Sequence, residues 1–190
     1  SRKRDSRDEE LARVTKMIGE SYMGLKDYES ARTFFEKAMQ VTKKVGNLGV
    51  KHPFYRECML KSGMACAASG NEIHARSIYQ SCLNFVTKEK AEQEFLPIYD
   101  LLWKSCLKSD EEETLKEGVK WMENALRKVQ EEAEARKAEK KPKILAAMQE
   151  NWMKRFSDLI ELQKKLEAGS SEILRVYESA MDAFRKFYKY

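Results

Sequence analysis

The chain is poor in the residues that break helices and build tight turns, with 8 glycines and 3 prolines among 190 residues. A β-sandwich or β-barrel needs turn residues about every ten positions, so this scarcity argues against an all-β fold. Charged residues make up 35% of the sequence and hydrophobic residues 42%. Good helix formers such as Ala, Leu, Glu, Lys, Arg and Met are abundant. The composition therefore predicts an all-α fold with enough apolar residues for a layered core.

Motifs that mark common enzymes and metal sites are also missing. The chain has two histidines, His52 and His74, and neither stands near a serine, a cysteine and a carboxylate in the manner of a catalytic triad. No glycine-rich nucleotide-binding motif and no metal-ligand spacing occurs. We therefore expect a non-catalytic protein without a metal or a cofactor.

The four cysteines, Cys58, Cys66, Cys82 and Cys106, include no CxxC pair and no zinc-like spacing with histidine. Buried reduced thiols are expected, which indicates a reducing compartment. No apolar run approaches the ~20 residues of a membrane span, and no signal peptide is visible. The prediction is a cytoplasmic protein. A chain that begins at Ser1 without methionine suggests an origin inside a longer protein.

Basic and acidic residues are not segregated along the sequence. The net charge is +5, and basic residues are interspersed with acidic ones almost everywhere. A nucleic-acid-binding protein would gather its basic residues on one face. Nucleic acid is therefore the less favoured partner, and strong salt dependence would be its mark.

A repeated pattern of small and aromatic residues runs through the first two-thirds of the chain. Its first copy has spacings of 0, 3, 12, 16 and 19 and consists of Gly19, Tyr22, Ala31, Phe35 and Ala38. A second copy follows 44 residues later and consists of Gly63, Cys66, Ala75, Tyr79 and Cys82. A degraded third copy continues with Cys106, Gly118, Met122 and Ala125. We expect the small residues to let two antiparallel helices approach closely, with the aromatic residues filling the space around each crossing.

This pattern resembles the tetratricopeptide repeat, a helix–turn–helix unit that stacks into a solenoid. The period is about ten residues longer than the usual ~34. In this respect the chain is similar to the long-repeat subclass found in kinesin light chains and in cell-polarity and ciliary scaffolds. The resemblance implies a protein-interaction scaffold or adaptor in a larger assembly, with a cytoskeletal or ciliary setting as an extension of the analogy.

The expected organisation has four parts. Residues 1–10 form a lead-in, 11–130 the helical repeats, 131–142 a charged helix or linker, and 143–190 a C-terminal helical hairpin. The last helix of that hairpin, residues 172–190, carries a broad apolar stripe. That stripe either caps the repeats or forms a coiled coil with another subunit. A structural oligomerisation module acting through these C-terminal helices is therefore the alternative function.

In the resembled family one helix of each repeat lines a concave groove. Carried over by register, the partner-binding groove would show Arg13, Lys16, Met17, Glu20, Met23, Glu57, Leu60, Lys61, Met64, Ala67, Asp100, Trp103, Lys104 and Leu107. Met64 and Trp103 are the expected anchors for a helical or extended protein segment.

The same register predicts one partner that does not bind. Chaperone-binding members of the family hold a C-terminal carboxylate with a clamp of Lys, Asn and Arg. Here Lys16 matches the first lysine, but Glu20 and Asp100 replace two clamp positions. Both would repel a carboxylate at close range. We therefore expect no binding of the acidic tails of heat-shock chaperones.

Overall fold

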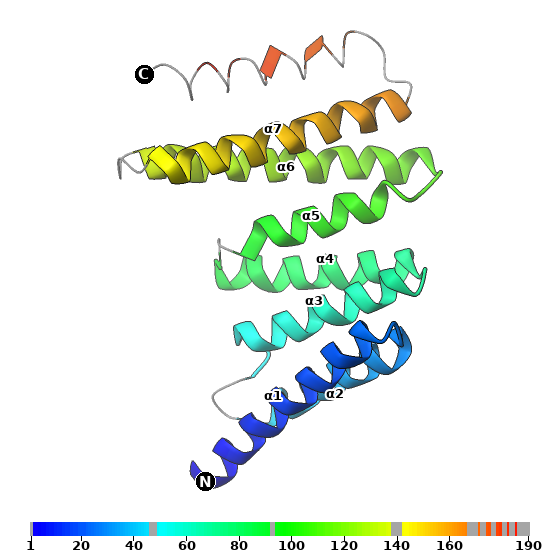
Figure 1. The fold of residues 1–190 in the computed structure, drawn as a ribbon, viewed down its shortest axis with the longest axis vertical. Coiled ribbons are helices and arrows are strands. Elements are labelled where there is room, and N and C mark those ends of the chain that lie inside the picture. The colour runs from blue at the N-terminus through cyan, green and yellow to red at the C-terminus, as the bar shows by residue number, and fades with distance from the viewer. Residues whose placement is uncertain are drawn as a thin grey trace. The chain divides into compact units, whose positions relative to one another are not determined.

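The computed structural model describes residues 2–45, 49–91, 94–137, 142–166 and a few separate positions between 171 and 185. All regular structure within these residues is α-helical (Figure 1). The helices are α1 Arg2–Gly24, α2 Tyr28–Lys44, α3 Pro53–Ala68, α4 Glu72–Glu89, α5 Phe95–Cys106, α6 Glu112–Lys137 and α7 Pro142–Lys165. The predicted all-α helical repeat fold is confirmed for this part of the chain.

The turn inside each of the first two hairpins has the same geometry 44 residues apart. Asp27 caps α2 by accepting a hydrogen bond from the backbone amide of Ser30, and Asn71 caps α4 by accepting one from that of His74, both at 3.2 Å. These side chains satisfy amides that have no partner within the helix. The residue before each cap is left-handed, with φ 61° at Lys26 and φ 89° at Gly70. The sequence repeat is therefore also a repeat of backbone conformation.

The chain divides into two compact units, residues 1–94 and 95–190. In unit 1 the helices pack in chain order, α1 against α2, α2 against α3 and α3 against α4. In unit 2 helix α5 packs against α6, and α6 packs against α7. The division at residue 94 falls inside the region 11–130 that the sequence assigns to repeats.

The interior of unit 1 pairs one glycine with one aromatic ring in each repeat. A Cβ atom added to Gly19 would lie 2.8 Å from Cε1 of Phe35, and one added to Gly63 would lie 2.5 Å from Cε1 of Tyr79. Both rings are fully buried. Each glycine therefore makes room for a ring of the facing helix, which places the aromatic residue of the pattern at the crossing.

The remaining packing positions of the pattern are also interior. Ala31, Ala38, Cys66, Ala75 and Cys82 are all at most 3% exposed. Tyr22 is half-buried and stacks on Phe34, with 5.3 Å between ring centroids. All four cysteines are buried thiols, as expected.

Unit 2 has a core rich in aromatic side chains, and the small residues Cys106 and Ala125 of the third copy are also buried there. The core cluster contains the buried residues Trp103, Met122, Val129, Trp152, Phe156 and Leu159. Trp152 and Phe156, one turn apart on α7, stack with 5.4 Å between ring centroids. The apolar stripe of residues 172–190 lies outside the described residues, namely Ile173, Val176, Tyr177, Ala180, Met181, Phe184 and Phe187. The coiled-coil alternative therefore stays a prediction.

Candidate functional site

Predicted groove residues from α1 and α3 meet at one hollow in unit 1. This hollow, called the methionine hollow below, has a volume of about 330 Å³ and is lined by Glu20, Met23, Phe35, Lys61 and Met64. Four of these residues were predicted for the groove. Phe35 of α2 was predicted only as a packing residue, and it is the buried member of the lining.

Charged side chains beside the methionine hollow pair with one another between α1 and α3. Lys16 Nζ lies 2.7 Å from Glu57 Oε1, and Lys61 Nζ lies 3.0 Å from Glu20 Oε1. Lys16 also lies 3.8 Å from Glu20. The two ammonium groups and two carboxylates together carry no net charge. Glu57 is among the positions predicted for the groove, but its pairing with Lys16 was not predicted, because that contact depends on how α1 and α3 align.

The ion pair with Glu57 also affects the pKa of Lys16. Burial alone would lower the pKa of Lys16, but the hydrogen bond and the charge of Glu57 outweigh burial and raise that pKa above its ordinary value. Lys16 Nζ also lies 5.3 Å from the centroid of the Phe54 ring. Lys16 therefore stays charged at neutral pH and is held by groups of the protein itself.

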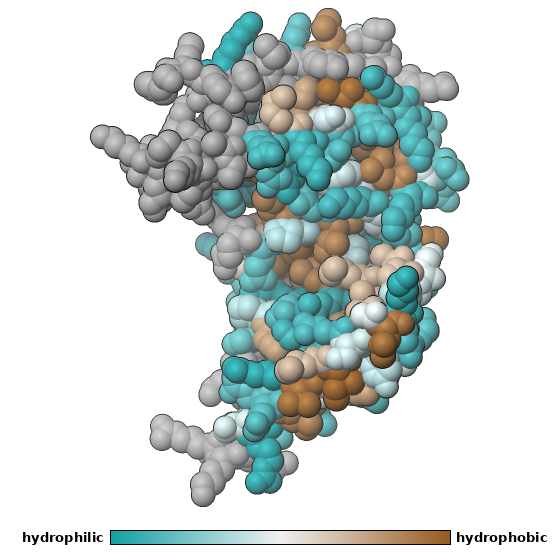
Figure 2. All heavy atoms as spheres, viewed as in Figure 1, coloured by the Kyte–Doolittle hydropathy of each residue, from teal (hydrophilic) through white to brown (hydrophobic). Residues whose placement is uncertain are grey.

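The other unit 1 positions predicted for the groove do not line the methionine hollow and differ in exposure. Met17 is 61% exposed, and Arg13 pairs with Glu9 at 2.8 Å on the surface of α1. Leu60 is half-buried on α3. Large apolar side chains are exposed elsewhere in unit 1 too, and Figure 2 shows brown hydrophobic surface where Figure 1 draws α1 and α2.

The positions predicted from the third repeat belong to unit 2 and do not present a groove anchor. Trp103 is 4% exposed and lies in the aromatic core, and its Nε1 donates to Asp100 at 3.2 Å. Lys104 is exposed, with its Nζ 5.7 Å from the centroid of the Trp103 ring, and Leu107 is half-buried. We therefore leave Trp103 out of the candidate site. The sequence signal that could have indicated this core is the apolar stripe of α7, which contains Trp152 and Phe156.

Asp100, a predicted clamp position, is also engaged within unit 2. It accepts a hydrogen bond from Nε of Arg155 at 2.9 Å and a second one from the same guanidinium. Arg155 is 7% exposed. A carboxylate held by a nearly buried guanidinium is a structural pair.

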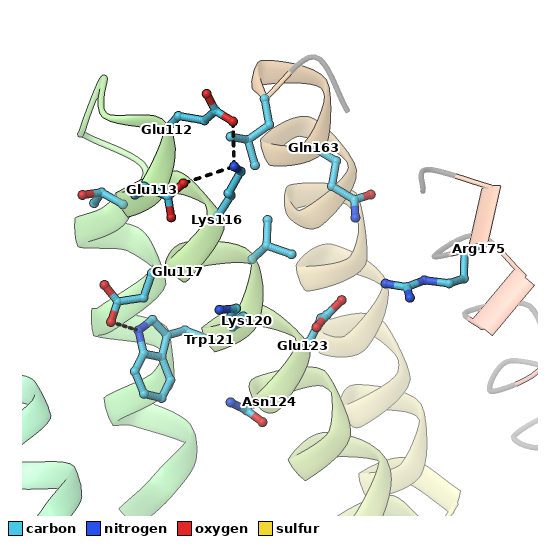
Figure 3. A pocket seen from close by; sticks show the side chains of 13 residues that line it. Glu112, Glu113, Lys116, Glu117, Lys120, Trp121, Glu123, Asn124, Gln163 and Arg175 are labelled. Atoms are coloured by element: carbon cyan, nitrogen blue, oxygen red, sulfur yellow. Dashed lines mark hydrogen bonds and ion pairs between the residues drawn. The ribbon is translucent and has the colours of Figure 1, made fainter. Parts of the chain in front are cut away.

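A second, larger hollow of about 1050 Å³ lies along α6 and α7 and includes Arg175 (Figure 3). Several of its charged side chains pair with one another. Lys116 pairs with Glu112 at 2.7 Å and with Glu113 at 3.2 Å. Trp121 Nε1 donates to Glu117 at 3.2 Å. The hollow is lined by both charged and apolar side chains, and several of the charged ones are engaged in these contacts.

The described residues hold no group of three or more His, Cys, Asp or Glu side chains placed to bind a metal ion. None of the helices in this part of the chain is long and apolar enough to cross a membrane.

Comparison with known proteins identifies the N-terminal region. Residues 10–88, which span most of α1, all of α2 and α3 and all but the last residue of α4, match the family model described as Tetratricopeptide repeat. This part of the chain is a tetratricopeptide repeat region, a kind of helical module that generally mediates protein–protein interaction and is typically non-catalytic.

Among curated proteins there is no match. Two similar solved structures are "DHF58 filament" and "DHF79 filament". The first has 15% identity and a TM-score of 0.54, and the match covers 97% of each chain. The second has 18% identity and a TM-score of 0.41, and the match covers 95% of this chain and 97% of the other. At such identity the first comparison supports the helical fold alone.

Proposed function

We propose that this protein is a non-catalytic scaffold or adaptor whose methionine hollow holds an apolar side chain of a protein partner. The observation that carries the proposal is the hollow itself, which is lined by Met23, Met64 and the ring of Phe35. Methionine is flexible and polarisable, so it adapts to aromatic or aliphatic anchors and contacts them favourably. A small apolar pocket with charged edges suits an anchor residue from a helical or extended segment.

The charges around the hollow favour a partner whose anchor region is uncharged. Lys16 and Lys61 already pair with Glu57 and Glu20. An incoming carboxylate would have to displace one of these internal carboxylates, and Glu20 would remain close by to repel it. The proposed partner is therefore not the acidic tail of a chaperone. We further propose that the protein acts within a larger cytoplasmic assembly.

The test is selection of ligands from a random peptide library displayed on phage, using the full chain as bait. We expect the selected peptides to share a Leu, Met, Phe or Trp anchor. The Met64→Asp variant should weaken their binding by about tenfold or more, since a charge would enter the apolar pocket. Met64 is 42% exposed, so the fold should tolerate the change.

The matched control is Ile73→Asp, because Ile73 is an exposed apolar residue of the same unit that does not line the hollow. This variant should bind the selected peptides like the wild type. Selection of peptides with acidic C-termini, or affinity that is equal for Met64→Asp and wild type, would overturn the proposal.

A further inference from the structure

The sulfur-containing side chains of unit 1 include buried thiols and accessible thioethers. Cys58, Cys66 and Cys82 are at most 3% exposed. In the methionine hollow, Met64 is 42% exposed and Met23 is half-buried. An oxidant in solution therefore reaches Met64 more readily than it reaches any of these three thiols.

Burial also keeps the thiols in their less reactive form. Peroxides attack the thiolate, and burial raises the pKa of Cys58 and of Cys82 to about 12. Burial raises the pKa of Cys66 as well. These thiols are therefore protonated at neutral pH. A methionine sulfur carries no proton, so its oxidation depends on exposure and needs no ionisation.

Oxidation would change the character of the methionine hollow. Two of its three apolar lining residues, Met23 and Met64, carry sulfur, and the third is Phe35. Methionine sulfoxide is polar, and its oxygen would lose its hydrogen bonds with water when an apolar side chain covers it. The ammonium group of Lys61, which also lines the hollow, is already paired with Glu20 at 3.0 Å. A sulfoxide in this hollow therefore opposes the binding of an apolar anchor.

We propose that Met64 is an oxidation site, and that its conversion to methionine sulfoxide releases the apolar side chain held in the methionine hollow. This regulation rests on the proposed function of the hollow. The oxidant is a peroxide. Its O–O bond breaks, one oxygen atom bonds to the sulfur of Met64, which loses two electrons, and the other oxygen leaves as water when the peroxide is hydrogen peroxide. Methionine sulfoxide reductases reverse the change with electrons from a thiol.

The order of oxidation is the first test. The full chain is treated with increasing hydrogen peroxide, and tandem mass spectrometry of its tryptic peptides locates each added oxygen. Met64 and Met17, which is 61% exposed, should be oxidised before the half-buried Met39 and Met59. The thiols should remain reduced at that stage. Oxidation of Cys58 before Met64 would overturn the proposal.

The second test measures binding of the tightest peptide from the phage selection, labelled for fluorescence anisotropy. Oxidised full chain should bind this peptide about tenfold or more weakly than untreated chain. Treatment with the two reductases that act on the two sulfoxide epimers should restore the affinity. The thermal transition should be unchanged, because Met64 is exposed. A transition lowered by the oxidation would indicate loss of the fold and would overturn the proposal.

Two leucine variants assign the effect to one residue. Met64→Leu keeps an apolar side chain of similar volume that cannot be oxidised, so peptide binding should survive the peroxide. The matched control is Met17→Leu, because Met17 is exposed on α1 and does not line the hollow. This variant should lose affinity on oxidation as the wild type does. Equal loss in Met64→Leu would contradict the assignment to Met64.

Failure of this regulation is distinct from failure of the proposed function. Unchanged affinity after complete oxidation of Met64 would overturn the regulation and leave the methionine hollow as the binding site. If the untreated chain selected no peptide with an apolar anchor, the proposed function would be wrong and the regulation would be wrong with it.

Discussion

The two tetratricopeptide repeats of unit 1 place equivalent residues, 44 positions apart, in different surroundings. Val14 and Ile18 of the first repeat are exposed, whereas Cys58 and Ser62 of the second are buried. Ala12 of the first corresponds to Arg56 of the second, and both are interior. The glycine and ring pairs are alike in the two repeats. The comparison teaches that contacts inside a hairpin follow from the repeat pattern, while burial of the outer faces depends on the neighbouring helix.

The largest expected effect comes from removing the ring inside each hairpin. Phe35→Ala and Tyr79→Ala should each lower the free energy of unfolding by about 3–5 kcal/mol, because a fully buried aromatic side chain leaves a cavity. Chemical denaturation followed by circular dichroism measures both losses. A loss below about 1 kcal/mol in either repeat would show that this hairpin does not depend on its ring.

Removing the buried charge of the second repeat should have the next largest effect on stability. Arg56 is 3% exposed and donates to both carboxylate oxygens of Glu94, at 2.7 and 2.5 Å. Arg56→Met should cost about 3 kcal/mol, because it leaves Glu94 without its partner. The double variant Arg56→Met/Glu94→Gln should regain most of that loss in the same denaturation experiment.

The control for this pair is an exposed ion pair of the same unit. Lys51 pairs with Glu89 at 3.4 Å with its side chain 78% exposed, so Lys51→Met should change stability by less than about 1 kcal/mol. Equal losses for Arg56→Met and Lys51→Met would contradict the difference in burial.

A smaller effect is expected at the glycines, and it should differ between the repeats. Gly63→Ala should destabilise by about 1–2 kcal/mol, because the strain of the 2.5 Å contact exceeds the gain in helix propensity. Gly19→Ala, with a 2.8 Å contact, should cost less. Gly24→Ala meets nothing within 4 Å and should be neutral or stabilising. Thermal unfolding of the three variants gives the order of their stabilities. A Gly19→Ala variant that is less stable than Gly63→Ala would contradict the argument.

Alkaline pH should destabilise the second repeat through its thiols. Burial raises the pKa of Cys58 and of Cys82 from 9.0 to about 12. The unfolded chain therefore releases these protons first, so the folded chain binds more protons between about pH 9 and pH 12 and stability falls as the pH rises. Each thiol should contribute about 1.4 kcal/mol per pH unit in that window.

The first repeat supplies the control residues for this titration, because Val14 and Ala38 stand at the equivalent positions. The Cys58→Val/Cys82→Ala variant should have a flatter dependence of unfolding free energy on pH from 8.5 to 10. An unchanged slope would show that other groups carry the pH dependence.

The packing of the repeats could be predicted because it is local in sequence. Gly19 and Phe35 lie within one helix–turn–helix, so spacing alone brings them together. Glu20, Met23, Lys61 and Met64 line one hollow, in agreement with the register, and their role in binding a partner stays a prediction. Phe35 as a lining residue of this hollow and Glu57 as a partner of Lys16 were missed, because both depend on how side chains of two or three helices meet.

Trp103 shows where such reasoning fails. Its position in the third repeat suggested an exposed anchor, but α7 brings Trp152 and Phe156 into the same core. A large aromatic residue fits a binding groove and a core equally well by composition. Trp103 lies in a core because α7, about fifty residues further along the chain, packs its aromatic side chains into the same cluster.

Amino-acid order alone determined the helices, their caps and the glycine–ring pairs, since each arises from residues within about twenty positions that meet whenever the hairpin forms. Only the tertiary structure decided which outer faces are covered. Val14 and Cys58 occupy the same place in the repeat, yet one is 47% exposed and the other 0%. The physical reason is that burial of an outer face depends on a neighbouring helix. On α3 that neighbour is α2. None of the described helices of unit 1 covers the same face of α1, so Val14 stays exposed.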